Sequence, residues 1–325
     1  MKHSSRQVVV DGHEIHVVEQ GEGPVVLFCH GFPDTAETWR RQMQAVADAG
    51  FRAIALDMRG FGRSHAPRDV SQYTSLMVAG DLVGLLDVVG ARTAVLVGHD
   101  WGADYVQRTA LLRPDRVRAV VSLSIPFAPR GELSLRDDLE ARGLGDRYYA
   151  HAMARPGGGA DFEPASRSVP SVLHWLSASP PPDERWDPVD PRKHLLRESP
   201  VAVPPWADAD YVAHTIREFE RTGFDTGLNY YRAVQASFDL TPALKGAVIR
   251  QPSLYIWGKA DGLCQFFHPG GASLATLRET QPGLRGQVAV DTAGHWVQHE
   301  AAEVVNRELV AFLTALDPID QEAAA

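Results

Sequence analysis

Residues 95–103, VLVGHDWGA, constrain the fold of this chain more than any other stretch. The apolar, β-branched run that ends at Val97 predicts a buried strand. Apolar residues then recur at helical spacing from Tyr105 to Leu112, and Pro114 marks the end of that helix. A glycine stands at each end of the intervening turn, where the Cβ atom of a larger residue would collide with its neighbours. The stretch therefore predicts a strand, a sharp turn and a helix.

This layout is typical of a nucleophile elbow, in which the central residue projects from a strained turn between strand and helix. The central residue here is Asp100, where the familiar version of the motif has serine. A carboxylate is ionised at neutral pH, so it attacks without a base and forms an ester with an alkyl carbon. One alternative stays open on this stretch alone: an ordinary turn whose Asp100 faces solvent or caps the helix.

The composition limits the class of protein. The chain has 325 residues, a length that favours one large domain with an insertion. Hydrophobic residues make up 44% and charged residues 22%, which is typical of a soluble globular protein. Its net charge of −9 argues against nucleic-acid and anionic-membrane partners. We see no apolar segment typical of a signal peptide or a membrane span. The two cysteines, Cys29 and Cys264, are too few for a disulfide framework or a thiolate zinc site. We therefore expect a soluble, cytoplasmic protein.

Strand and helix patterns alternate in the first and last parts of the chain, which predicts a mostly parallel sheet with helices on both faces. Eight strands are expected, at residues 7–10, 14–19, 25–29, 52–57, 93–97, 117–123, 253–257 and 287–290. The segment between them lacks apolar strand runs and is rich in proline and aromatic residues. We predict an α/β core at residues 1–129 and 238–325, a helical lid inserted at residues 130–237, and a frayed tail at residues 317–325.

Two polar residues beyond the predicted lid come directly after strands. Asp261 follows the strand at residues 253–257, and His295 follows the strand at residues 287–290. Sites in open α/β sheets form at the carboxyl ends of the strands, so both side chains are expected beside Asp100. Nucleophile, acid and histidine is also the chain order of an elbow enzyme.

Two other aspartates compete for the role of the acid. Asp291 is close to His295 in sequence, and we expect it to support the loop instead. Asp225 falls in the lid and is less well placed. The loop after the strand at residues 117–123 is another position for the acid in such folds, but it contains no carboxylate. Asp261 is therefore favoured.

Four motifs resemble those of the epoxide hydrolases of the α/β-hydrolase fold. They are HGFP at 30–33, DMRGFGRS at 57–64, GHDWG at 98–102 and GHWVQ at 294–298. The segment at residues 223–232 is similar to the part of the lid that carries one tyrosine of that family. The resemblance implies an α/β-hydrolase fold, a cis peptide bond before Pro33, and hydrolysis of an epoxide to a vicinal diol with no metal or cofactor.

The resemblance also implies roles for individual residues. Asp100 would open the epoxide and form a covalent ester, and His295, oriented by Asp261, would activate the water that hydrolyses it. The backbone N–H groups of Phe32 and Trp101 would form the oxyanion hole.

Family members hold the epoxide oxygen with two acidic donors in the lid, because opening the ring creates an alkoxide. Tyr231 matches one of them. Aligning the segment on its following turn places His151 at the other, whereas a gap of one residue would place Tyr148 or Tyr149 there.

The lid also suggests what kind of substrate is bound. It contains three of the seven tryptophans, at positions 175, 186 and 206. An aromatic pocket for a bulky epoxide is therefore a hypothesis, with Tyr149 and Trp186 as candidate substrate-binding residues.

Two alternative functions are considered, a closely related enzyme and a protein of another class. Dehalogenases share the aspartate nucleophile, but haloalkane dehalogenases commonly have asparagine where this chain has Phe32, and haloacetate dehalogenases have arginine where it has Trp101. The other alternative is a non-catalytic, ligand-binding member of the fold. An intact set of catalytic residues argues against it.

Overall fold

One eight-stranded sheet forms the centre of the computed structural model, which describes residues 4–316. Its strands are β1 (Ser4–Val10), β2 (His13–Gln20), β3 (Val25–Cys29), β4 (Arg52–Leu56), β5 (Ala94–His99), β6 (Val117–Leu123), β7 (Ser253–Gly258) and β8 (Leu284–Val290). Their order across the sheet is β1-β2-β4-β3-β5-β6-β7-β8. β2 is antiparallel to both of its neighbours, and the other pairs are parallel. The prediction of a mostly parallel eight-stranded sheet is confirmed.

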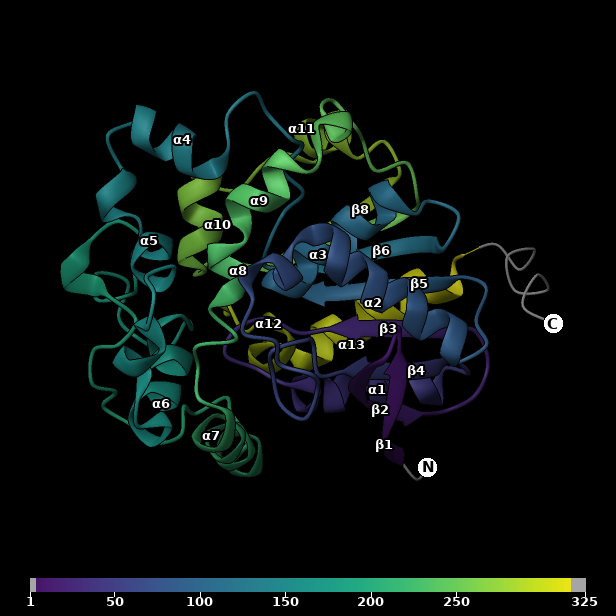
Figure 1. Cartoon of the computed structure of the whole chain (residues 1–325), viewed down its shortest axis with the longest axis horizontal. Helices are drawn as coiled ribbons and strands as arrows, with labels where there is room; N and C mark the ends of the chain where they lie inside the picture. The colour runs from purple at the N-terminus through teal and green to yellow at the C-terminus, as the bar shows by residue number, and fades with distance from the viewer. Residues whose placement is uncertain (1–3, 317–325) are drawn as a thin grey trace.

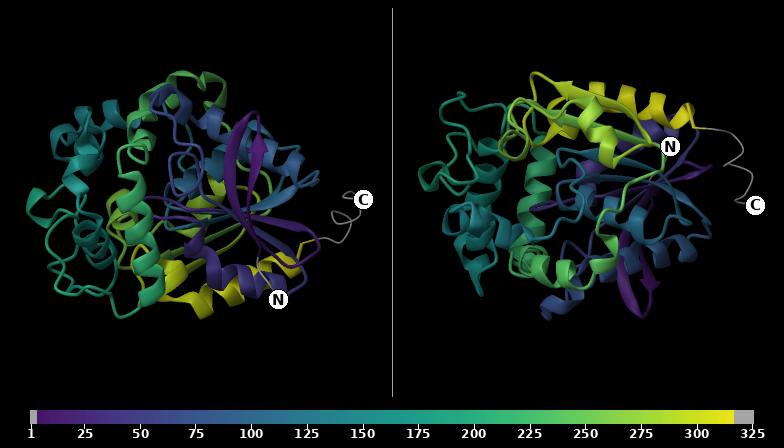
Figure 2. Two further views of the ribbon diagram at one scale, coloured as in Figure 1. Left: turned by 60° about the horizontal axis from the view of Figure 1, so that its bottom comes forward. Right: turned by 90° about the horizontal axis from the view of Figure 1, so that it is seen from above.

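Helices cover both faces of this sheet. The helices α1 (Arg40–Asp48) and α13 (Ala302–Thr314) lie side by side on one face (Figure 2). The helices α2 (Ser75–Val88) and α3 (Trp101–Leu112) pack together on the other. Successive side chains of a strand point to opposite faces, so neighbouring residues of β3 join different cores. Leu27 belongs to the core under α2 and α3, and Phe28 to the core under α1 and α13.

The remaining α-helices lie in the segments that follow β6, β7 and β8. Between β6 and β7 the chain forms α4 (Leu135–Ala141), α5 (Tyr149–Met153), α6 (Ala165–Trp175), α7 (Ala209–Thr222), α8 (Asn229–Arg232) and α9 (Val234–Asp239). After β7 come α10 (Gly262–Phe267), α11 (Leu274–Thr280) and α12 (Val297–Glu300). Figure 1 shows the lid helices, in teal and green, gathered at one end of the sheet.

Three predictions about the chain's organisation have different outcomes. Within the described residues, the segment between β6 and β7 contributes no strand to the sheet, as expected. The division into core and lid at residues 129/130 and 237/238 stays a prediction, and its second boundary falls inside α9. The predicted frayed tail at residues 317–325 lies outside the described residues. No helix found between residues 4 and 316 is both long and apolar enough to cross a membrane.

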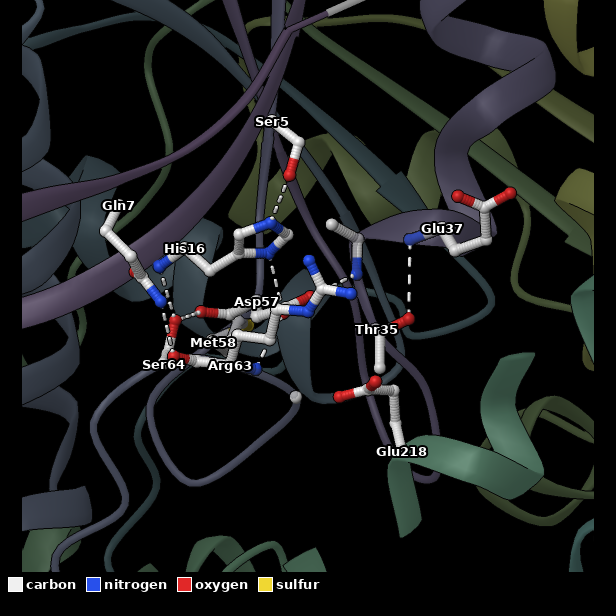
Figure 3. A network of polar contacts seen from close by, with 12 residues as sticks. Ser5, Gln7, His16, Thr35, Glu37, Asp57, Met58, Arg63, Ser64 and Glu218 are labelled. Carbon is white, nitrogen blue, oxygen red and sulfur yellow. Dashed lines mark hydrogen bonds and ion pairs between the residues drawn. The ribbon is translucent and has the colours of Figure 1, made fainter. Parts of the chain in front are cut away.

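A buried polar network holds the loop after β4 in place (Figure 3). Asp57 accepts hydrogen bonds from His16 Nδ1 at 2.8 Å and from the N–H groups of Ala36 at 2.8 Å and Arg63 at 2.9 Å. Burial would raise the pKa of Asp57, but the hydrogen bond and charge of His16 outweigh it and lower that pKa. A Cβ atom on Gly62 would collide with the Asp57 carboxylate, which explains the glycine at that position of the motif.

Candidate active site

Asp100 stands at the sharp turn between β5 and α3, with φ 54° and ψ −123°. Residues other than glycine seldom adopt a positive φ, and such strain is common at functional sites. A Cβ atom on Gly98 would collide with the carbonyl of Gly102, and one on Gly102 with the carbonyl of Cys29. Asp100 makes no capping hydrogen bond to α3 and is only 6% exposed. The alternative of a solvent-facing or capping aspartate is therefore wrong.

Asp261 and His295 both lie beside Asp100. The Nδ1 atom of His295 is 3.0 Å from Oδ2 of Asp261, and its Nε2 atom is 3.6 Å from Oδ2 of Asp100. All three side chains are buried. The competing acids lie elsewhere: Asp291 pairs with a lysine at 2.6 Å, and Asp225 with an arginine at 2.7 Å.

The two carboxylates determine the charge of His295. Burial disfavours the imidazolium, but the charges of Asp261 and Asp100 outweigh burial and raise the pKa of His295 above its usual value. Burial would also raise the pKa of Asp100, and there the nearby His295 outweighs it and lowers that pKa. In the unreacted site His295 lies between two carboxylates, which favour its protonated form. Loss of the Asp100 charge would lower the pKa of His295.

The loop after β3 brings a backbone donor to the nucleophile. The N–H of Phe32 donates to Oδ1 of Asp100 at 2.9 Å, and a Cβ atom on Gly31 would collide with the same carboxylate. The peptide bond between Phe32 and Pro33 is cis, as the resemblance implies. Trp101 is the first residue of α3, so its N–H has no acceptor within the helix.

The backbone of the histidine loop is held by residues that the sequence analysis did not identify. The carbonyl of His295 accepts hydrogen bonds from His99 Nε2 at 2.8 Å and from Ser124 Oγ at 2.6 Å. Burial and the charge on His295 lower the pKa of His99 to about 3, so His99 is neutral and Nε2 carries its proton. No sequence pattern marks these contacts, because they join segments that are distant along the chain.

Two lid tyrosines, Tyr149 and Tyr231, lie near the nucleophile. The rings of Tyr149 and Tyr231 have centroids 6.0 Å apart, and the ring of Tyr231 is 4.8 Å from that of Trp101. Burial raises the pKa of Tyr231 well above its usual value, and the charge of Asp100 raises it further. Burial, the two neighbouring tyrosines and Asp100 do the same for Tyr149. Both phenols are therefore protonated over the whole range of physiological pH.

The structure places Tyr149, and not His151, next to Tyr231. Residues two apart on a helix point in directions about 200° apart, and α5 carries both. His151 lines another cavity, of about 320 Å³, whose wall also includes Tyr231. Within residues 4–316, no hydrogen bond, ion pair or ring contact joins it to Asp100 or Tyr231. Tyr148 packs instead against Phe266, with ring centroids 5.5 Å apart.

A cavity of about 300 Å³ adjoins Tyr149. Trp186 also lines it, and the two rings meet edge to face with centroids 4.9 Å apart. The other lid tryptophans lie outside its walls: Trp175 donates to the carbonyl of Arg197 at 2.9 Å, and Trp206 packs near His299. In the part of the chain that the structure describes, no cluster of three histidine, cysteine or acidic side chains is arranged to hold a metal ion.

Comparisons with known proteins agree with this geometry. A family model described as the alpha/beta hydrolase fold matches residues 24–302. The chain is 51% identical to an epoxide hydrolase of Caballeronia sordidicola over 312 residues, which cover 96% of this chain and 94% of that protein. It is 37% identical to epoxide hydrolase A of Mycobacterium tuberculosis, with 97% and 98% of the two chains covered.

Solved structures give the same result. Epoxide hydrolase A from Mycobacterium thermoresistibile has a TM-score of 0.87 and 38% sequence identity, with 97% of this chain and 99% of that chain covered. An epoxide hydrolase from an endophytic Streptomyces has a TM-score of 0.88 and 37% identity, with 97% and 96% covered. This chain is therefore similar to these epoxide hydrolases in both backbone and sequence over nearly its whole length.

Proposed function

We propose that this chain, which belongs to the epoxide hydrolase family of the α/β-hydrolase fold, converts an epoxide to a vicinal diol through a covalent ester. One observation carries the proposal. A buried aspartate on the elbow lies 3.6 Å from the histidine of a histidine–aspartate pair and near two protonated lid tyrosines. A nucleophile, a base and an acid are the three groups that this two-step reaction requires.

The first step joins the substrate to the protein. Oδ2 of Asp100 attacks an epoxide carbon, and the ring C–O bond breaks as the ester forms. The other carboxylate oxygen, Oδ1, stays on the N–H of Phe32 and becomes the ester carbonyl. Tyr149 and Tyr231 hydrogen-bond the ring oxygen, and one of them protonates the alkoxide. Tyr149 takes this role in place of His151 because α5 directs the tyrosine toward the nucleophile.

The second step releases the diol. Alkylation removes the negative charge of Asp100, which lowers the pKa of His295. Its Nε2 proton then leaves and, through solvent, replaces the proton that a lid tyrosine gave to the alkoxide, so neutral His295 can act as a base. His295 takes a proton from water, the resulting hydroxide attacks the ester carbonyl, and Asp261 stabilises the imidazolium. The N–H groups of Phe32 and Trp101 hold the oxyanion until the bond between the ester carbon and the diol oxygen breaks. The leaving oxygen takes the proton of the added hydroxyl, and Asp100 is again a carboxylate.

The substrate is a small-molecule epoxide, with water as the second reactant and no metal or cofactor. The substituent of the epoxide lies against Tyr149 and Trp186, whose aromatic rings favour an apolar group. We place the enzyme in the cytoplasm, an assignment supported by Cys29 and Cys264, which are both buried and free of disulfides.

A single turnover in ¹⁸O water tests the mechanism. The first diol is expected to be mostly unlabelled, because its new oxygen comes from the Asp100 carboxylate, and the label is expected in the Asp100 peptide. A fully labelled first diol with unlabelled protein would contradict the covalent route. Release of halide from a haloalkane at a comparable rate, with no diol formed from a panel of epoxides, would identify a dehalogenase.

The two steps are expected to respond differently to acid. Alkylation needs an ionised Asp100 and protonated tyrosines, and their lowered and raised pKa values keep these forms at pH 5. Hydrolysis needs a neutral His295, so its rate constant should fall about tenfold for each pH unit below the pKa of that residue in the ester. Rapid-quench mass spectrometry should therefore find the alkylated protein accumulating at pH 5. Parallel loss of both rate constants would contradict this assignment.

A further inference from the structure

Hydrogen bonds hold the backbone of the loop that carries His295 at the histidine and on both sides of it. The carbonyl of His295 accepts from two core side chains, and its N–H donates to the carbonyl of Leu176 at 3.0 Å. Leu176 lies at the end of the lid helix α6. The N–H groups of Gly294 and Trp296, on either side of the histidine, both donate to Glu300. Their distances to the carboxylate are 3.0 Å each.

Glu300 also binds the lid. Its Oε2 atom accepts from the N–H of Ala178 at 2.8 Å as well as from Gly294, while Oε1 accepts from Trp296. One carboxylate thus joins the last turn of α12, the histidine loop and the segment after α6. Burial raises the pKa of Glu300 to about 7, while the hydrogen bonds from Ala178, Gly294 and Trp296 favour its ionised form, which accepts all three.

The lid segment and the histidine loop are in direct contact at this point. A Cβ atom on Gly294 would lie 2.6 Å from the carbonyl carbon of Ser177 and 2.7 Å from the nitrogen of Ala178. No side chain fits between the two backbones, so the hydrogen bonds to Glu300 set their relative position.

We infer that Glu300 is a positioning residue for the hydrolytic step, holding His295 at its place by fastening the histidine loop to Ala178 of the lid. This inference rests on the proposed function. The ester is formed by Asp100 and the two tyrosines, and none of these contacts Glu300. The water attack depends on where Nε2 of His295 stands, so a loosened loop should slow hydrolysis of the ester and spare alkylation.

Glu300→Gln tests the inference with almost no change in volume. The amide keeps one acceptor oxygen and places an NH₂ group against at least one backbone N–H, so two donors face each other. Rapid-quench mass spectrometry of a single turnover measures the rise and the decay of the alkylated protein separately. The decay constant is expected to fall about tenfold or more, since hydrogen bonds to charged groups are among the stronger ones, while the rise changes less than about threefold.

Glu303→Gln is the matched control, because Glu303 lies on the exposed first turn of α13 and the same chemical change is made there. It should leave both rate constants unchanged. Glu300→Asp is the second variant, used if the glutamine form does not fold. It keeps the charge but shortens the reach, and should also slow the decay selectively.

Three results would overturn the inference: an unchanged decay constant in the Glu300 variants, an equal loss in both rate constants, or a selective loss in the Glu303 control as large as that in Glu300→Gln. A wild-type enzyme that never becomes alkylated by an epoxide would instead contradict the proposed function. The two failures are therefore distinguishable in the same experiment.

Discussion

Replacement of His295 by glutamine is expected to arrest the enzyme as its covalent ester. Asp100 still opens the epoxide, but no base remains to activate water, so turnover should fall on the order of 10³-fold. The protein should gain the full mass of the substrate, since opening an epoxide releases no leaving group. Intact-mass measurement followed by peptide mapping should locate the added mass on the peptide that contains Asp100.

The matched control for this experiment is the double variant Asp100→Asn with His295→Gln, which should gain no mass. Replacement of His13, which lies partly exposed at the start of β2, should leave turnover unchanged. An adduct on another peptide, or no adduct despite substrate consumption, would contradict the assignment of Asp100 as the nucleophile.

Removal of the lid hydroxyls is expected to slow the other half of the reaction. Tyr149→Phe and Tyr231→Phe should each lower the alkylation rate constant about 10²-fold, because the hydrogen bond to the epoxide oxygen strengthens as charge develops on it. Substrate binding should weaken much less. Stopped-flow or rapid-quench measurement of ester formation separates the two effects.

Two neighbours on the same segment serve as controls. Tyr148→Phe removes a hydroxyl from a ring that packs against Phe266, and should change alkylation only slightly. His151→Ala should also change the alkylation rate constant only slightly. If His151→Ala were as damaging as Tyr231→Phe while Tyr149→Phe were silent, the histidine would be the first lid donor, as the sequence alignment had placed it.

Local patterns in the sequence were sufficient to predict the sheet and the residues that lie at the carboxyl ends of its strands. The elbow around Asp100 is defined by glycines that no other residue could replace without collision, so the turn is visible in the letters alone. The strands before Asp261 and His295 are short apolar runs, and parallel strands deliver their last residues to the same edge. Chain order and topology are therefore enough to predict that Asp100, Asp261 and His295 lie together.

Short helices were harder to predict, because a few residues carry no reliable periodicity. The helix α10, which begins directly after Asp261, was not predicted from the sequence. The identity of the first lid donor could not be predicted for the same reason. Tyr149 and His151 lie on the five-residue helix α5, and only its packing against the rest of the lid decides which one faces the nucleophile.

The tertiary structure also decided the contacts between distant backbones. Glu300 collects N–H groups from the histidine loop and from the lid, which are more than a hundred residues apart in the chain. Hydrogen bonds of this kind depend on backbone position and not on the identity of the donor residue, since every residue except proline offers the same N–H. A sequence records side chains, so it identified Asp100, Asp261 and His295 by their chemistry but left the carboxylate that fastens the histidine loop unmarked.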